Sequence, residues 1–180
     1  MPIVRGKDIE VLYSASAIAR RNLELAKEIA SRDYHDLLVI SVLKGSFIFA
    51  ADLIRAMHDV GLSPEVEFIF ISSYGAGTTS GEVRVLRDID NDVAGRDVLL
   101  IDDILESGKT LAFTRKLMME RGAKSCSIAV LLDKRMRRQA DLEADYVGFD
   151  CPDHFVVGYG MDFAHAFREL PFVGVVTGDA

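Results

Sequence analysis

One stretch of this sequence combines residue types that bind phosphate, sugar hydroxyls and divalent cations. An apolar run at residues 98–101 leads directly into Asp102 and Asp103, and residues 104–110 follow as Ile-Leu-Glu-Ser-Gly-Lys-Thr. Backbone amides and hydroxyls in a small-residue turn at a helix N-terminus can bind a phosphate group. The two carboxylates can accept hydrogen bonds from ribose hydroxyls or hold magnesium. The stretch therefore predicts a site for a phosphorylated sugar, with its phosphate turn at residues 107–110.

Parts of the sequence resemble two other nucleotide-binding motifs, but each lacks a glycine at the position that the motif requires. The triplet Gly108-Lys109-Thr110 ends like a P-loop, but that motif needs a glycine where this chain has Asp103. The triplet at residues 75–77 begins like a dinucleotide fingerprint, but Ser80 stands at the third glycine position. A solvated strand end would also explain the acidic pair, and the buried character of the run before it disfavours that alternative.

The elements that would position this site alternate between strands and helices. Continuous apolar runs predict buried strands, because a sheet with one wet face would show alternation. Helical spacing of apolar residues predicts helices at 16–30, 47–60 and 110–121. Strands are expected at 37–43, 66–72, 83–86, 97–101, 125–132, 146–149, 155–157 and 172–176. The strand at 97–101 would end at the acidic pair, and the tract 73–81 would form a mobile loop.

This alternation predicts an α/β fold with a mainly parallel central sheet flanked by helices. Ligands in such sheets bind beyond the carboxyl ends of the strands, where residues 102–110 would lie. The length of 180 residues and the lack of internal repeats favour a single domain, residues 1–180. We expect its core at about residues 35–140, and a small cap from about residues 1–34 and 141–180.

The charge of the chain argues against a nucleic-acid surface. The sequence has 21 Lys and Arg against 28 Asp and Glu residues, a formal charge of -7, whereas polymer binding needs many basic contacts to phosphate. No apolar stretch is long enough for a membrane span, and the N-terminal segment has no signal-peptide core. We therefore expect no nucleic acid, no membrane contact and a cytoplasmic location.

Four segments, in chain order, resemble those of a known family. Residues 98–110 resemble the signature of type I phosphoribosyltransferases that binds phosphoribosyl pyrophosphate (PRPP). Within that group, Leu43-Lys44-Gly45 resembles the pyrophosphate loop of the hypoxanthine phosphoribosyltransferases, in which the peptide before the lysine can be cis. Residues 132–135, Leu-Asp-Lys-Arg, resemble their purine-binding lysine segment, and residues 152–162 with Phe167-Arg168 resemble their base and metal site. The implied fold is the type I phosphoribosyltransferase fold, with a hood from the two terminal segments.

The resemblance implies a magnesium-dependent purine salvage reaction. The 5-phosphoribosyl group of PRPP would pass to hypoxanthine or guanine, giving IMP or GMP and pyrophosphate. Lys134 would donate to the purine 6-oxygen, Phe155 would stack on the ring, and Val156 and Asp162 would complete the purine site. Because an ammonium group only donates, Lys134 would favour a 6-oxo over a 6-amino purine. An ordinary core aromatic is the alternative for Phe155, and Arg137 and Arg138 are expected to be solvated.

The resemblance implies that residues of the other matched segments bind PRPP. Lys44, Gly45 and Arg168 would hold pyrophosphate, with magnesium on Asp162. Asp102 and Asp103 would hold the ribose hydroxyls and a second metal. The nucleotide-binding loop would consist of Ile104, Leu105, Glu106, Ser107, Gly108, Lys109 and Thr110.

Two further features follow from the same resemblance. Glu106 would be the general base that takes a proton from the imidazole ring of the purine, at a position where the family more usually has aspartate. The loop that begins with Ser73 and Tyr74 would be a lid that excludes water from the activated ribose carbon.

Some alternatives stay open on the sequence. A transferase for xanthine or for a pyrimidine would share the PRPP site, although Lys134 and Phe155 argue against a pyrimidine. A regulator that senses PRPP or a nucleotide could keep the fold without the chemistry, although Glu106 and the acidic charge disfavour it. The resemblance implies a homodimer or homotetramer, and no residue pattern distinguishes these, nor hypoxanthine from guanine.

Overall fold

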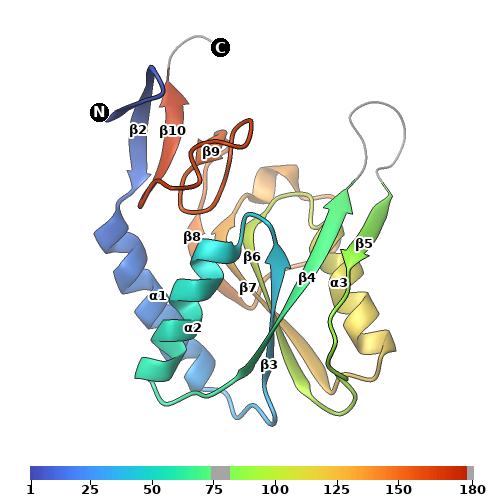
Figure 1. The fold of residues 1–180 in the computed structure, drawn as a ribbon. Helices are drawn as coiled ribbons and strands as arrows, with labels where there is room; N and C mark the ends of the chain where they lie inside the picture. The colour runs from blue at the N-terminus through green and yellow to red at the C-terminus, as the bar shows by residue number, and fades with distance from the viewer. Residues whose placement is uncertain (74–81, 178–180) are drawn as a thin grey trace.

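The computed structural model describes residues 1–73 and 82–177 and has a six-stranded sheet at its centre (Figure 1). The strand order is β5-β4-β3-β6-β7-β8. The bounds are β3 Leu38–Leu43, β4 Glu65–Ser73, β5 Val83–Arg87, β6 Asp97–Leu105, β7 Ser125–Asp133 and β8 Tyr146–Asp150. Neighbouring strands are parallel except β4 and β5, which pair antiparallel at one edge. The predicted α/β fold with a mainly parallel sheet is confirmed.

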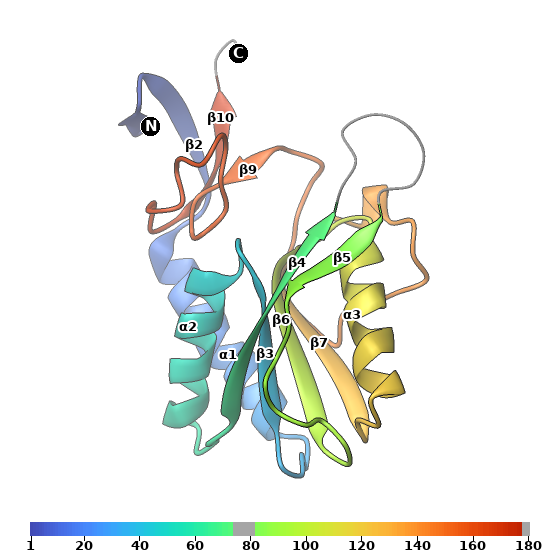
Figure 2. The same cartoon turned by 45° about the vertical axis from the view of Figure 1, so that its right-hand side comes forward.

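Helices cover both faces of this sheet, which explains why its central strands are apolar throughout. Helices α1 (Ala15–Ala30) and α2 (Phe47–Asp59) pack on one face, and α3 (Lys109–Glu120) packs on the other (Figure 2). On β3, Val39 joins the core under α1 and α2, whereas its neighbour Leu38 joins the core under α3. Burying one such side chain stabilises the fold by about 1.5–3 kcal/mol, so both faces contribute.

Helix α1 is fixed to the sheet by a cap, an apolar face and a partly buried cation. It begins where the Ser14 hydroxyl accepts a hydrogen bond from the Ala17 amide at 3.2 Å. From its inner face, Arg21 donates to the carbonyl oxygens of Val147 at 2.7 Å and Gly148 at 2.8 Å. These contacts cover the edge strand β8.

Among the helices of the described residues, none is both long and apolar enough to cross a membrane.

A second, antiparallel sheet joins the two ends of the chain beyond the carboxyl edge of the main sheet (Figure 1). Its order is β1-β2-β10-β9, with bounds Ile3–Val4, Lys7–Tyr13, Val173–Thr177 and Val156–Val157. This cap has a small core of its own, built from Ile9, Val157, Ala166, Phe167 and Leu170. The cap therefore covers the strand ends where the sequence predicts a ligand.

The structure corrects four details of the expected organisation. Helix α1 and strand β8 belong to the core layer, because they pack on the main sheet or join it. Strands β1 and β2 were not predicted, because β1 has only two residues and the apolar residues of β2 lie among charged ones. Strand β6 does not stop at the acidic pair but continues to Leu105, paired with β7. A short 3-10 helix, Arg135–Arg137, follows β7.

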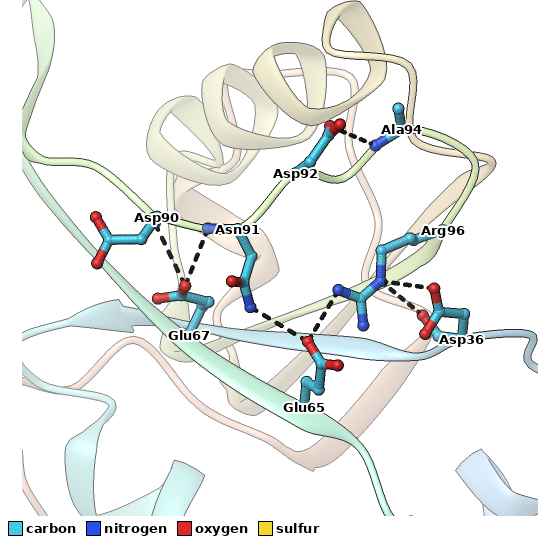
Figure 3. A network of polar contacts seen from close by, with 8 residues as sticks. All are labelled: Asp36, Glu65, Glu67, Asp90, Asn91, Asp92, Ala94 and Arg96. Carbon is cyan, nitrogen blue, oxygen red and sulfur yellow. Dashed lines mark hydrogen bonds and ion pairs between the residues drawn. The ribbon is translucent and has the colours of Figure 1, made fainter.

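The opposite, amino edge of the sheet is held by a polar network (Figure 3). Arg96 Nη1 donates to Glu65 Oε2 at 3.0 Å, and its Nε donates to the Asp36 carbonyl oxygen at 3.1 Å. Glu67 accepts from the backbone amides of Asp90 and Asn91. The network joins the starts of β3, β4 and β6 and lies away from the edge that carries the cap.

Candidate active site

A cavity of about 620 Å³ lies between the carboxyl edge of the sheet and the cap. Nearly every described residue that the sequence analysis assigned to a site contributes to its wall. These residues are Lys44, Gly45, Ser73, Asp102, Asp103, Ile104, Leu105, Glu106, Ser107, Gly108, Thr110, Lys134, Phe155, Val156, Asp162 and Arg168. Lys109, whose side chain is exposed, is not part of this wall, and Tyr74 lies outside the described residues.

The phosphate turn follows β6 and leads into α3. Gly108 precedes the helix with φ of 80°, a left-handed conformation that glycine adopts without steric cost. The Ser107 hydroxyl accepts a long hydrogen bond from the Lys109 amide at 3.4 Å. Gly108 has no side chain, so no side-chain cap binds the backbone amides in the first turn of α3. These amides lie at the positive end of the dipole of a 12-residue helix, next to the cavity. This arrangement suits a phosphate group.

The acidic pair lies at the floor of the cavity on β6. Burial raises the pKa of both Asp102 and Asp103, and the neighbouring Asp103 charge raises that of Asp102 further. Each carboxylate accepts one hydrogen bond from the next backbone amide, from Asp103 at 2.9 Å and from Ile104 at 2.8 Å. Two partly buried carboxylates side by side are stabilised by hydroxyl donors or by a cation, which is what a ribose or a metal provides.

Gly45 lies between two parts of the site with no room for a side chain. A Cβ added there would lie 2.0 Å from Asp103 Oδ2. On the cap side, a Cβ added at Gly160 would lie 2.5 Å from the Gly45 carbonyl oxygen. The peptide between Leu43 and Lys44 is cis. The loop after β3 is therefore packed directly between the acidic pair and the cap.

Lys134 is buried at the end of β7 and forms an ion pair inside the cavity. Its Nζ donates to Glu106 Oε1 at 2.8 Å, and its side chain is 5% exposed against 42% for Glu106. The predicted purine lysine and the predicted base are thus brought into contact, from two neighbouring strand ends. The pair puts a donor and an acceptor within reach of one bound ring.

The cap supplies the remaining predicted residues. Phe155 is 59% exposed and meets Phe163 edge to face, with ring centroids 5.7 Å apart, so it is not a core aromatic. Asp162 Oδ1 lies 3.2 Å from Arg168 Nη2, and Arg168 Nη1 donates to the Gly160 carbonyl oxygen at 2.6 Å. A carboxylate, an arginine and an exposed ring therefore face the cavity from above.

Magnesium fits the donor chemistry of this cavity. Within the described parts of the chain, no three His, Cys, Asp or Glu side chains converge on a common metal position. Magnesium in phosphate-transfer sites is commonly held by one or two carboxylates together with substrate phosphates, so such a cluster is not required. Asp162, Asp102 and Asp103 supply those carboxylates.

Some functional features were missed on the sequence. Arg138 was expected to be solvated, but its side chain is only 16% exposed and donates to Asp133, Glu106 and Leu142. Its neighbour Arg137 is 60% exposed, as expected. The apolar lining from Leu43, Phe70, Ile71, Leu111 and Met161 was not identified either. Only the acidic residue before Lys134 could have pointed to a buried partner for Arg138.

Comparison with known families fits this geometry. The sequence model of the phosphoribosyl transferase domain matches residues 8–164. The chain belongs to the phosphoribosyltransferase family. The hypoxanthine-guanine phosphoribosyltransferase of Bacillus subtilis is 49% identical over 173 residues, covering 94% of each chain. The hypoxanthine phosphoribosyltransferase of Escherichia coli K12 is 42% identical over 172 residues, 93% of this chain and 95% of the relative.

Solved phosphoribosyltransferase structures share the fold. A hypoxanthine phosphoribosyltransferase from Staphylococcus aureus superposes with a TM-score of 0.87 at 40% identity, covering 93% of this chain and 91% of the other. A mutant of the hypoxanthine phosphoribosyltransferase from Trypanosoma cruzi, in a ternary substrates complex, gives 0.87 at 39% identity, with 95% and 96% covered. The expectation of a type I phosphoribosyltransferase fold is confirmed.

Proposed function

We propose that this chain transfers the 5-phosphoribosyl group of PRPP to hypoxanthine, guanine or both. The products would be IMP or GMP and pyrophosphate. The observation that carries the proposal is the contact of Lys134 Nζ with Glu106 Oε1, at 2.8 Å, in the same cavity as the phosphate turn. A donor for the 6-oxygen and an acceptor for a ring proton then lie beside the sugar site. The names of the relatives at 42% and 49% identity support the same substrates.

PRPP would lie across the carboxyl edge of the sheet. Its 5'-phosphate would take hydrogen bonds from the turn at residues 107–110 and from the dipole of α3. Asp102 and Asp103 would accept hydrogen bonds from the ribose hydroxyls. The pyrophosphate would lie against the backbone of Lys44 and Gly45, with Arg168 opposite.

The purine would lie between the end of β7 and the cap. Lys134 would donate to the 6-oxygen, which leaves the amino group of adenine without an acceptor there. The exposed face of Phe155 would stack on the ring, and the Val156 backbone would read the ring edge. This selection excludes adenine but leaves hypoxanthine, guanine and xanthine to be separated by assay.

The reaction would be a displacement at ribose C1' through an oxocarbenium-like state. The bond from C1' to the pyrophosphate oxygen breaks, and a bond from C1' to a ring nitrogen of the base forms. The Glu106 carboxylate would take the proton from the imidazole ring, which prevents positive charge from accumulating on the base. Arg168 and Lys44 would stabilise the charge on the departing pyrophosphate. Magnesium, when held by Asp162, Asp102 or Asp103, supplies further positive charge there.

The decisive experiment compares bases under one set of conditions. The protein is incubated with PRPP, magnesium and hypoxanthine, guanine, xanthine, adenine or orotate, and pyrophosphate release is followed. Release with hypoxanthine or guanine supports the proposal. Pyrophosphate release with orotate alone would identify a pyrimidine transferase. Binding of PRPP with no pyrophosphate release in the presence of any base would identify a sensor. A cytoplasmic location, a homodimer or homotetramer, and the lid at Ser73 and Tyr74 stay predictions.

A further inference from the structure

The side chain of Arg138 lies behind the phosphate turn, and all of its nitrogens act as donors. Nε donates to the Glu106 carbonyl oxygen at 3.0 Å, Nη1 to the Leu142 carbonyl oxygen at 2.5 Å, and Nη2 to the Asp133 carboxylate. The side chains of Arg138 and Asp133 are 16% and 5% exposed. A planar guanidinium held in three directions at low exposure fixes the groups around it.

Two of these acceptors adjoin different residues of the cavity wall. Asp133 is the last residue of β7 and directly precedes Lys134. The Glu106 carbonyl oxygen belongs to the backbone that follows β6. Arg138 therefore bridges the two strand ends from which Glu106 and Lys134 reach each other at 2.8 Å, in addition to the backbone pairing of Leu105 with Asp133.

The residues after Arg138 support the phosphate turn from the same side. The amides of Gln139 and Ala140 both donate to the Ser107 carbonyl oxygen at 2.9 Å. A Cβ added at Gly108 would lie 3.2 Å from Arg138 Cδ and 3.3 Å from Ala140 Cβ. The turn is therefore packed against residues 138–140 with no spare room.

We propose that Arg138 is a positioning residue that holds the Glu106 base and the phosphate turn in register with Lys134. This inference rests on the proposed function. Arg138 does not line the cavity and touches no reacting atom, so it acts through the Glu106 backbone and Asp133. Arg135 Nε also donates to Asp133 at 3.1 Å, but its side chain is 71% exposed, so that pair is the weaker restraint.

The test uses two variants of Arg138 and one neighbouring control. Arg138→Lys keeps the positive charge opposite Asp133 but cannot make all three hydrogen bonds of the guanidinium. Arg138→Ala removes the guanidinium and leaves a cavity that free guanidinium can fill. Arg137→Ala is the control, because Arg137 is 60% exposed and pairs with Asp153 at 2.7 Å. We measure kcat and the KM values for PRPP and hypoxanthine, with the unfolding temperature of each variant.

The expected results separate positioning from stability. Arg138→Lys lowers kcat roughly 10- to 100-fold, because small displacements of catalytic groups have effects of that order, and it raises KM for PRPP. Millimolar guanidinium restores part of the kcat of Arg138→Ala, whereas ammonium at equal concentration does not. Arg137→Ala behaves as wild type. A purely structural role would lower the unfolding temperature without this specific rescue.

Two outcomes would overturn the inference. One is a kcat and PRPP KM for Arg138→Lys within about twofold of wild type. The other is a folded Arg138→Ala protein whose lost activity guanidinium does not restore. Failure of the proposed function looks different, because wild-type protein would then release no pyrophosphate with any 6-oxopurine.

Discussion

The Lys134 ammonium and the Glu106 carboxylate form a 2.8 Å ion pair between the ends of β7 and β6. Lys134 is buried and Glu106 is half exposed, so the pair lies at the boundary between the protein interior and the cavity. Both groups are proposed to contact the purine. Binding of the base would therefore exchange one ion pair for two contacts to the ring. Glutamate is one methylene longer than the aspartate that the family resemblance leads us to expect, and this length contributes to its reach.

Lys134→Gln is expected to weaken purine recognition more than PRPP binding. A hydrogen bond to a charged group contributes about 1.5–3 kcal/mol, so kcat/KM for hypoxanthine should fall roughly 10- to 100-fold. Because an amide can both donate and accept, the preference for hypoxanthine over adenine should also fall. Steady-state kinetics with both bases measure this. A variant with undiminished discrimination would remove Lys134 from the purine site.

Glu106→Ala is expected to lower turnover while PRPP still binds. Loss of a general base typically costs a factor of about 100 to 10,000. Calorimetry with PRPP and magnesium checks that binding survives, and Glu120→Ala is the control because Glu120 is an exposed residue on α3. Turnover equal to wild type would exclude Glu106 as the base.

Gly45→Ala is expected to abolish most activity with little loss of secondary structure. The added Cβ would lie 2.0 Å from Asp103 Oδ2, so either the loop or the carboxylate must move. Gly95→Ala is the control: its added Cβ meets no atom within 4 Å, although its φ of 73° introduces strain. We expect the control to lower the unfolding temperature but to keep kcat. Wild-type activity for Gly45→Ala would show that the contact with Asp103 has no role.

Asp88→Asn is expected to lower stability at neutral pH but not in acid. Two hydrogen bonds from Arg121, at 2.9 and 2.5 Å, hold the pKa of Asp88 below its ordinary value. A lowered folded pKa gives stability that is present above the unfolded value, near 3.9, and is lost as pH falls through the folded value. Thermal unfolding should differ by roughly 1–4 °C at pH 7, and the difference should disappear as pH falls through the folded pKa of Asp88. Asp90→Asn, at an exposed residue nearby, is the control.

The elements that the sequence predicts well are those with one dominant signal. The apolar runs within β3, β6 and β7 are buried on both faces, so composition predicts these three strands, although not the extension of β6 past Ile101 to Leu105. Strand β2 pairs with β10 across most of the chain length. Its alternation Ile9-Glu10-Val11 is typical of a strand with one wet face, but it spans only three residues and does not identify the distant partner. The amphipathic face of α1 predicts a helix but not that it packs on α2 and β8.

The site residues also divide into those with a clear local sequence signal and those that depend on tertiary contacts. Asp102 through Thr110 could be identified because a strand, two acids and a small-residue turn have one common chemical use. Arg138 could not, since two of its acceptors are backbone carbonyl oxygens that no composition specifies. Its buried partner Asp133 depends on tertiary packing.

The most direct test of the central claim is a crystal structure with IMP, magnesium and pyrophosphate. We expect the purine 6-oxygen within hydrogen-bond distance of Lys134 Nζ, the purine ring stacked on Phe155, and the 5'-phosphate on the turn at residues 107–110. A nucleotide bound elsewhere, or one in the cavity with its phosphate away from that turn and Lys134 still paired only with Glu106, would contradict it.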